Sequence, residues 1–534
     1  DCLPALRNKT EIARHLQDYL SAPGVELPGT LKSLLEFPQP DSVPGQLAAT
    51  TFTKAVETLA RKYISGETLP QALKTLQQLR QQKQAFTLDV LGEAVISEVE
   101  AQQYLDRYLD LMTQLSEAAN QWKPVPDIDR AGDRDLPKVQ VSVKLSAFDS
   151  QFDPLDAEGT KARVSDRVRT LLRRAREVGA AIHFDMEQYA YKDLTLAILK
   201  ALLLEDEFRD RDDIGLTLQA YLPNSGDDLH DLIGWAKQRG TPVTIRLVKG
   251  AYWDRETITA SQNHWPHPVY PTKAGTDANF ERLTQLLLEN HRYLYAAIGS
   301  HNARSQARAI AIAQDLNVPP RAIELQVLYG MADKLAKALT TEGYRVRVYC
   351  PFGELVPGMA YLIRRLLENT ANTSFLRQSV SDVSAETLLA PPDVATEPPA
   401  PAAFGDRAPD TDYSQPEARA AAKRALQTVR QQLGNTYRPL INGQWVAGTN
   451  AIASVNPSNP DEAIGQIELA DLDAVERAIV AAKAAFPGWK RTPAGDRADL
   501  LRRVAELMSC KREDLSAWIV LEVGKPLAEA DADV

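Results

Sequence analysis

The stretch Ile214–Val248, which reads IGLTLQAYLPNSGDDLHDLIGWAKQRGTPVTIRLV, decides the fold class of this chain. It begins with an apolar run, Ile214–Tyr221, and ends with another, Val243–Val248. Between them, Asp228–Arg239 has the apolar spacing of an amphipathic helix. Two apolar runs joined through a helix predict a βαβ unit with parallel strands.

The same alternation of apolar runs and helical segments recurs from residue 86 onward. Eight such units in about 280 residues favour a closed (β/α)8 barrel, with an open doubly wound sheet as the alternative. The sequence therefore predicts an α/β protein built on a barrel. The runs expected to form its strands are Phe86–Gly92, Val139–Phe148, Ala181–Asp185, Ile214–Tyr221, Val243–Val248, Leu294–Gly299, Ile323–Leu328 and Val346–Tyr349.

The parts of the chain outside the barrel have other patterns. Residues 1–80 have helical periodicity, as in Glu11–Leu20 and Phe52–Ile64, and no catalytic motif, so we expect a helical arm. Prolines and alanines crowd Leu389–Pro409, a composition typical of a linker. We expect four parts: an arm over 1–80, a barrel over 81–376, a linker over 377–436 and a further ordered segment over 437–534.

Composition limits the classes of function. The chain has 534 residues and a net charge of −10, which argues against a nucleic-acid partner because duplex binding needs a concentrated basic face. Its three cysteines are widely spaced, which indicates a reducing compartment and neither a disulfide framework nor a metal site. No apolar run has the ~18–20 residues of a membrane span, and nothing at the start resembles a signal peptide. We expect a cytoplasmic protein.

Polar side chains lie at the end of nearly every apolar run. The carboxyl ends of barrel strands are where such folds place their chemistry. Any one of these residues could be a structural charge, but burying so many in one barrel mouth is costly unless they pair or bind a ligand. The sequence thus predicts a polar ligand site formed by Glu93, Lys144, Asp185, Glu187, Gln219, Tyr221, Arg246, Lys249, His301, Asn302, Gln326 and Tyr349.

A final helical segment after the last run adds a second feature. Tyr361, Arg364, Arg365 and Glu368 are spaced so that all four lie on one helix face. Two adjacent arginines can each offer a forked donor to a carboxylate. An ordinary solvated charged face remains the alternative.

Nucleotide-binding glycine motifs are absent from the sequence: it has neither a GxGxxG after a strand nor a P-loop. A flavin held by a barrel needs instead donors for its phosphates and a positive group near its redox-active ring. Residues Thr272–Gly275 could supply the phosphate donors, and Arg246 the positive group.

Several strings, in register along residues 86–376, resemble the motifs of the proline dehydrogenase family. The resemblance implies a distorted (β/α)8 barrel with non-covalent FAD, which oxidises L-proline to Δ1-pyrroline-5-carboxylate by hydride transfer and passes the electrons to a membrane quinone. The strings are VSVKLSA (Val141–Ala147), HFDME (His183–Glu187), LQAYL (Leu218–Leu222), RLVKGAYW (Arg246–Trp253), and YLIRRLLEN (Tyr361–Asn369) followed by ANTS (Ala371–Ser374).

The resemblance also implies roles for single residues. Arg246 and Asp185 are expected to be catalytic, Arg364, Arg365 and Lys144 to bind the proline carboxylate, and Glu93 and Glu368 to hold this clamp. The remaining residues expected to contact the substrate are Tyr252, Leu328, Tyr349 and Tyr361. Those expected to bind FAD, besides Arg246, are Gln219, Val248, Lys249, Gly250, Ala251, Trp253, Thr272, Lys273, Ala274, His301, Asn302 and Gln326.

The tail carries a second resemblance. Four strings, LINGQW (Leu440–Trp445), VNP (Val455–Pro457), AFPGW (Ala485–Trp489) and EVGKP (Glu522–Pro526), resemble the start of an aldehyde dehydrogenase. This implies a bifunctional enzyme of proline catabolism, of which the chain would hold an incomplete second domain. The catalytic cysteine and most of the NAD-binding fold would lie beyond Val534, so we expect NAD-dependent activity to be absent here.

Two other functions remain open from the residues alone. A lysine in the barrel mouth, Lys144 or Lys249, could form a Schiff base in a lyase or aldolase. The barrel could also be a non-catalytic binding scaffold. The oligomeric state is left open, with a homo-oligomer among the options, and a quinone acceptor implies peripheral contact with the inner face of the membrane.

Overall fold

The computed structural model describes residues 6, 8–20, 39–92, 95–131, 134–354, 358, 361, 364–365, 384–394 and 408–534. It divides into two compact units. The first holds Asp1–Ile258 and His267–Pro401, and the second holds Thr259–Pro266 and Ala402–Val534.

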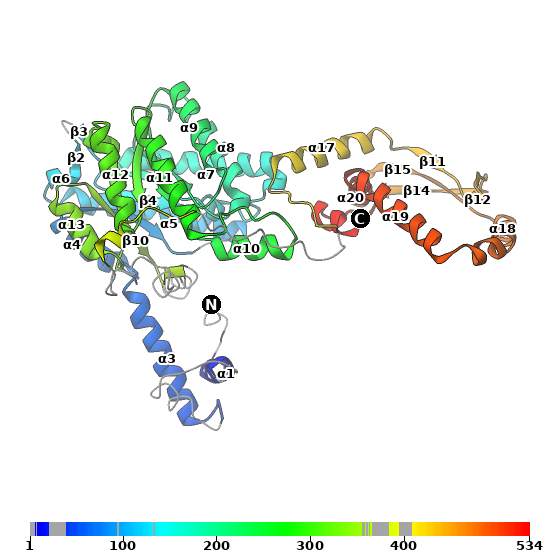
Figure 1. The fold of residues 1–534 in the computed structure, drawn as a ribbon, viewed down its shortest axis with the longest axis horizontal. Helices are drawn as coiled ribbons and strands as arrows, with labels where there is room; N and C mark the ends of the chain where they lie inside the picture. Colours follow the sequence, from blue (N-terminus) through cyan, green and yellow to red (C-terminus); the bar gives the residue numbers. More distant parts are fainter. Residues whose placement is uncertain are drawn as a thin grey trace. The chain divides into compact units, whose positions relative to one another are not determined.

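A closed barrel of eight parallel strands forms the centre of the first unit (Figure 1). The strands follow each other around the barrel in the order β1-β10-β9-β8-β7-β6-β5-β4. The closed barrel is thus confirmed, and the open sheet is excluded. The strands are β1 (Gln84–Val90), β4 (Gln140–Val143), β5 (Ala181–Phe184), β6 (Ile214–Gln219), β7 (Val243–Val248), β8 (Leu294–Gly299), β9 (Ile323–Leu328) and β10 (Val346–Phe352).

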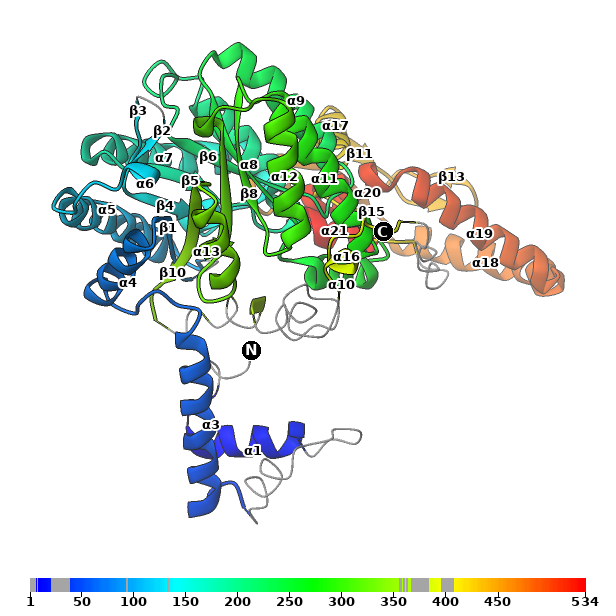
Figure 2. The same ribbon diagram turned by 60° about the vertical axis from the view of Figure 1, so that its left-hand side comes forward.

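Helices surround these strands (Figure 2). The helix of the βαβ unit quoted above shows how one of them ends. α9 is followed by Gly240, whose φ of 80° lies in the left-handed region that glycine adopts without strain. The described helices of the first unit's barrel region are α4 (Leu69–Gln81), α5 (Glu98–Asn120), α6 (Pro126–Asp129), α7 (Ala157–Val178), α8 (Tyr189–Leu202), α9 (Ser225–Arg239), the first part of α10 (Trp253–Gln262), α11 (Lys273–Glu289), α12 (Ala303–Asp315), α13 (Asp333–Thr341) and α16 (Ala385–Leu388), with β2 (Arg130–Ala131) paired to β3 (Arg134–Asp135).

The outer face of the barrel strands is apolar and packs against the helices. Phe184, Leu216, Ile245 and Leu247 are at most 1% exposed and belong to one continuous core. Burying an aliphatic or aromatic side chain of this size stabilises the fold by about 1.5–3 kcal/mol. Every second strand residue therefore holds the barrel to its helices and leaves the alternate residues for the interior.

The interior of the barrel is polar, whereas bulky branched residues dominate most barrels of this type. Thr87 Oγ1 and Ser142 Oγ lie 3.2 Å apart, and Arg246 Nη1 donates to Ser142 Oγ at 3.2 Å. His183 Nε2 lies 3.1 Å from Thr217 Oγ1, and burial, together with nearby Arg246, lowers the pKa of His183 well below its ordinary value. The interior is thus a hydrogen-bonded network rather than an apolar plug.

Among the described residues of the arm, α1 (Lys9–Leu20) and α3 (Val43–Arg61) precede α4, where the periodicity predicts helices. They pack through small residues, Ala13 against Ala48 and Ala49. The boundaries of the four predicted parts stay predictions.

The second unit contains a three-stranded sheet in the order β11-β15-β14, a two-stranded ribbon of β12 and β13, and five helices within the described residues. Its strands are β11 (Asn435–Tyr437), β12 (Leu440–Ile441), β13 (Gln444–Trp445), β14 (Asn450–Asn456) and β15 (Asn459–Leu469). Its helices are α17 (Pro416–Arg430), α18 (Leu472–Arg491), α19 (Ala494–Cys510), α20 (Arg512–Val523) and α21 (Leu527–Asp533). Across the described part of the chain, every helix is too short or too polar to span a bilayer.

Candidate active site

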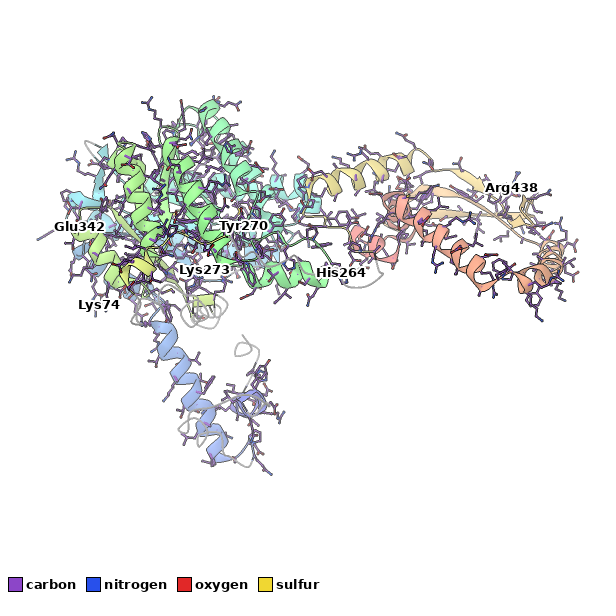
Figure 3. The ribbon with its side chains drawn as sticks, in the orientation of Figure 1. Lys74, His264, Tyr270, Lys273, Glu342 and Arg438 are labelled. Atoms are coloured by element: carbon purple, nitrogen blue, oxygen red, sulfur yellow. The ribbon has the colours of Figure 1, made fainter. Side chains whose placement is uncertain are left out.

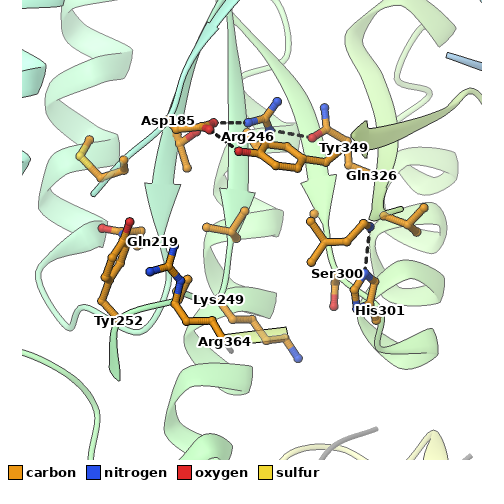
Figure 4. A pocket seen from close by; sticks show the side chains of 18 of the residues that line it. Asp185, Gln219, Arg246, Lys249, Tyr252, Ser300, His301, Gln326, Tyr349 and Arg364 are labelled. Atoms are coloured by element: carbon orange, nitrogen blue, oxygen red, sulfur yellow. Dashed lines mark hydrogen bonds and ion pairs between the residues drawn. The ribbon is translucent and has the colours of Figure 1, made fainter. Parts of the chain in front are cut away.

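A cavity opens at the carboxyl ends of the barrel strands and contains about 1090 Å³ of empty space, part of it open to solvent (Figure 4). Most of the predicted site residues line it, so the structure brings them together. They are Lys144, Asp185, Gln219, Arg246, Val248, Lys249, Gly250, Ala251, Tyr252, His301, Gln326, Leu328, Tyr349, Tyr361, Arg364 and Arg365.

Asp185, at the end of β5, is the most densely bonded acid in this cavity. Its carboxylate pairs with the Arg246 guanidinium and accepts a hydrogen bond from Tyr349 Oη at 2.7 Å (Figure 4). Arg246 Nε in turn donates to Gln326 Oε1 at 2.7 Å. Burial and the Asp185 carboxylate raise the pKa of Tyr349 well above its ordinary value, so the phenol stays protonated and keeps donating.

Lys144 is held by an acid that the sequence analysis missed. Its Nζ lies 2.7 Å from Asp89 Oδ1 and 3.8 Å from Asp185 Oδ2. Asp89 is 1% exposed, and burial raises its pKa against the opposing effect of the Lys144 ammonium. The signal was a charged residue inside the apolar run of β1, at a position that alternates toward the barrel interior.

Below this layer a second buried acid continues the network. Gln326 Nε2 donates to Glu324 Oε1 at 2.6 Å, and Glu324 also pairs with Arg347 and Arg345 at 2.8 Å each. Burial raises the pKa of Glu324, but the two guanidinium groups outweigh it and hold the pKa at about 2. Glu324 is therefore a permanently charged support beneath Gln326 and Arg246.

The predicted clamp residues lie on the cavity wall. Arg364 Cζ lies 4.9 Å from the centre of the Tyr252 ring, and Arg365 Cζ lies 5.0 Å from the centre of the Tyr361 ring. A guanidinium over an aromatic face is attracted to the ring and is held in a defined orientation. Their expected partners, Glu93 and Glu368, lie outside the described residues.

The wall formed by β6 to β9 has features that fit a planar ring system. Gln219 Nε2 donates to Glu187 O at 2.9 Å, while Gln219 Oε1 is buried and has no hydrogen-bond partner among the described residues. Gly250 has a φ of 132°, and a Cβ there would lie 2.4 Å from the Tyr221 ring. The open polar atom of Gln219 and the Arg246 cation suit a flavin ring, whereas the packed Tyr221 ring and the backbone conformation account for Gly250.

Two other predicted cofactor residues on this wall have internal partners. His301 Nε2 accepts a hydrogen bond from Leu328 N at 2.9 Å, and Lys249 Nζ lies 2.5 Å from Asp277 Oδ1. Burial lowers the pKa of Lys249. Five residues lining the cavity were not predicted to bind a ligand: Met186, Thr217, Gly299, Ser300 and Val327.

Some predicted cofactor residues do not line the cavity. Trp253 Nε1 donates to Tyr270 O at 2.9 Å, and Lys273 Nζ lies 2.6 Å from Asp277 Oδ2. Tyr270 and Lys273 are labelled in Figure 3. Thr272 caps α11 by accepting a hydrogen bond from Gly275 N, and Asn302 caps α12, so both side chains already stabilise a helix N-terminus. Cofactor binding by these residues and by Ala274 stays a prediction.

Three known family models match successive parts of the chain. The family model described as proline dehydrogenase matches residues 72–378, more than half of the chain. The chain belongs to the proline dehydrogenase family. A model of the proline utilization A N-terminal domain matches residues 1–63, and one of the aldehyde dehydrogenase family matches residues 445–534.

The chain is similar to bifunctional PutA proteins and to shorter proline dehydrogenases. The Escherichia coli bifunctional protein PutA is 28% identical over 508 residues, which are 90% of this chain and 37% of that protein. The proline dehydrogenase of Deinococcus radiodurans is 31% identical over 325 residues, 60% of this chain and 90% of that one. The chain thus spans little more than a third of the Escherichia coli PutA.

A solved structure resembles the whole chain. The crystal structure of proline utilization A from Bdellovibrio bacteriovorus, inactivated by N-propargylglycine, superposes with a TM-score of 0.90 at 40% identity and covers 100% of this chain and 54% of that protein.

Proposed function

We propose that the chain oxidises L-proline to Δ1-pyrroline-5-carboxylate, with FAD accepting the hydride. One observation carries the proposal. A cavity in a proline dehydrogenase family barrel is lined by two arginines, Arg364 and Arg365, and by the buried Asp185–Arg246 pair, with the Lys144 ammonium 3.8 Å from Asp185. This is the charge pattern that a small amino acid and a reducible ring require.

The charges of proline suit the cavity. Its carboxylate would be bound by Arg364 and Arg365, whose guanidinium groups can each make two parallel hydrogen bonds. Lys144 would add a third positive charge. The Tyr252 and Tyr361 rings, which already lie against the two arginines, would border the pyrrolidine ring. The clamp would fix where C5 of the substrate points, and orientation of this kind supplies much of the rate in hydride transfer.

Gln219, Arg246, Val248, Gly250, Ala251 and Gln326 would hold the isoalloxazine ring. When bound, FAD supplies a two-electron acceptor for the hydride that leaves C5. Arg246 would place a positive charge beside the ring, where reduction adds negative charge. Gln326 and Asp185 fix the Arg246 guanidinium from two sides, so this charge is preorganised.

The oxidation also releases a proton from the proline nitrogen, because the product is an imine. The described groups around that nitrogen would be the Asp185 carboxylate, the Tyr349 phenol and the Lys144 ammonium, with 2.7 Å between Tyr349 and Asp185. Asp185 would attract the substrate ammonium. Electrons would then pass to a membrane quinone by peripheral contact with the membrane.

Ion pairs argue against the Schiff-base alternative, although burial lowers the pKa of Lys249. Lys144 is engaged by Asp89 and Lys249 by Asp277, whereas a Schiff-base lysine needs a neutral amine. No observation favours a non-catalytic scaffold over the enzyme.

The test is formation of Δ1-pyrroline-5-carboxylate, trapped as its coloured adduct with o-aminobenzaldehyde. Purified protein supplied with FAD, L-proline and a soluble quinone analogue should form the product. N-propargylglycine should abolish the activity in a time-dependent way. Absence of product with FAD bound would contradict the proposal, and product formation that N-propargylglycine leaves intact would contradict the assigned pocket.

A further inference from the structure

A segment of the arm between α3 and α4, Tyr63–Gly66, lies against the end of β10 at the barrel mouth. Ser65 N and Ser65 Oγ both donate to Pro351 O, at 2.8 and 2.7 Å, and Gly353 N donates to Gly66 O at 3.1 Å. Gly66 forms a parallel bridge with Phe352. The arm thus adds a short length of strand to β10, near the cavity.

This addition fills a gap in the barrel. β9 pairs with β10 over Val346–Tyr349, whereas β1 pairs with it as far as Phe352. The last residues of β10 therefore lack a β9 partner on one side. A buried backbone polar group without a hydrogen-bond partner is costly. Ser65 and Gly66 supply the hydrogen bonds that β9 does not make to this part of β10.

Side chains of the same segment pack against the cavity wall from behind. Tyr63 and Ile64, 7% and 5% exposed, form a cluster with Leu91 and Tyr361. Tyr349 packs against this cluster. Two rings that line the cavity are therefore supported by the arm rather than by the barrel alone.

The turn after β9 makes room for the arm. Gly330 has a φ of 74°, and a Cβ on it would lie 2.1 Å from Lys62 O. The arm is therefore wedged between this turn and the end of β10. Leu328 and Tyr349, which both line the cavity, lie shortly before the residues that contact the arm, Gly330 and Pro351 respectively.

We propose that residues 63–66 are positioning residues for the substrate site, which set Tyr349 and Tyr361 at their working distance from the substrate. The inference rests on the proposed proline oxidation. Without the wedge, the end of β10 would relax, and the hydrogen bond between Tyr349 Oη and Asp185 would loosen. Because a displacement near 1 Å can cost about a hundredfold in rate, a shift of the strand end is enough to weaken the site.

Two matched glycines separate the wedge from backbone strain. Gly330→Ala introduces both a strained φ and the clash with Lys62, whereas Gly343→Ala, at a φ of 86° with no atom of the described residues within 4 Å, introduces the strain alone. Relative to Gly343→Ala, Gly330→Ala should raise the KM for L-proline about tenfold. Both variants should bind FAD stoichiometrically, and Gly330→Ala should melt at the lower temperature because the Lys62 backbone must shift.

Ser65 provides a milder second test that leaves the fold intact. Ser65→Ala removes the hydroxyl bond to Pro351 O but keeps the backbone bond, and should raise the KM about threefold. Ser65→Thr restores the hydroxyl and should restore the KM. The control is Thr58→Ala, which deletes an exposed hydroxyl bond to Lys54 O elsewhere in the arm and should leave the KM unchanged.

Amide hydrogen exchange of residues 346–354 gives a readout that does not depend on turnover. Exchange at Gly353 should accelerate in Gly330→Ala and stay unchanged in Gly343→Ala and Thr58→Ala. Equal KM values across all variants of an active enzyme would overturn the inference and leave the proposed function standing. A wild-type protein that binds FAD but is not reduced by L-proline would overturn the proposed function instead.

Discussion

The two ends of the barrel interior hold the same chemistry in different surroundings. At the mouth, Asp185 is paired with Arg246 beside a cavity, and at the floor, Glu324 is paired with Arg347. Gln326 connects them, since its Oε1 accepts from Arg246 and its Nε2 donates to Glu324. The mouth pair borders a cavity with about 1090 Å³ of empty space, whereas the floor pair borders a smaller one with about 460 Å³. We therefore expect the mouth pair to contact the substrate and the floor pair to act on stability.

The largest expected effect is at the mouth. Arg246→Met should lower kcat/KM for L-proline about a thousandfold, equivalent to roughly 4 kcal/mol, because it removes a preorganised charge beside the acceptor. Arg246→Lys, which keeps the charge but loses the fork, should recover part of this. Steady-state kinetics at full FAD occupancy measure it, and a loss below tenfold would remove Arg246 from the chemistry.

The matched change at the floor should act on stability instead. Glu324→Gln leaves two buried guanidinium groups without their carboxylate and should lower the free energy of unfolding by about 3 kcal/mol. Its amide oxygen can still accept from Gln326, so kcat/KM should change less than threefold. Denaturant unfolding and kinetics measure the two quantities. A Glu324→Gln variant with native stability and a large activity loss would contradict the claim that the floor pair acts on stability rather than on activity.

The acid sensitivity of the fold follows from the same carboxylate. The pKa of Glu324 is about 2 in the folded chain against an ordinary value of 4.5. Because it is lower in the folded state, Glu324 contributes stability above pH 4.5, and this contribution is lost as the pH falls from 4.5 toward 2. It amounts to roughly 3 kcal/mol. Wild type should thus lose more stability than Glu324→Gln over this range, and parallel pH profiles would contradict the assignment.

The smallest effect compares two arginines. Arg365→Lys at the mouth should raise the KM for L-proline about tenfold, near 1.4 kcal/mol, with little change in kcat, because a lysine cannot bind a carboxylate with two parallel bonds. Arg345→Lys at the floor is the control and should leave the KM unchanged. Equal KM values in both variants would mean that Arg365 does not bind the substrate.

The barrel itself could be predicted from the sequence, because its strands are local apolar runs separated by helices. The mouth was also predictable in part, since Asp185, Arg246 and Tyr349 end their runs or interrupt them. Glu324 was missed because it stands near the start of its run, away from the strand ends where the site was expected. Asp89 interrupts its run as Arg246 does, but its partner Lys144 comes from another strand. Sequence spacing alone could not pair them.

Contacts between distant parts of the chain were out of reach. Ser65 and Pro351 are 286 residues apart, and nothing in either segment indicates that they meet. The positions of Trp253, Thr272 and Asn302 outside the cavity could likewise not be predicted. The family resemblance implies roles for these residues, but local hydrogen bonds and helix caps decide where their side chains point.

The most direct test of the central claim is the visible absorption spectrum of the FAD-loaded protein, recorded without oxygen before and after L-proline is added. The account predicts an oxidised flavin band that L-proline bleaches in wild type and in Glu324→Gln, but far more slowly in Arg246→Met. A flavin band that L-proline leaves oxidised in wild type would contradict the claim that this cavity oxidises proline.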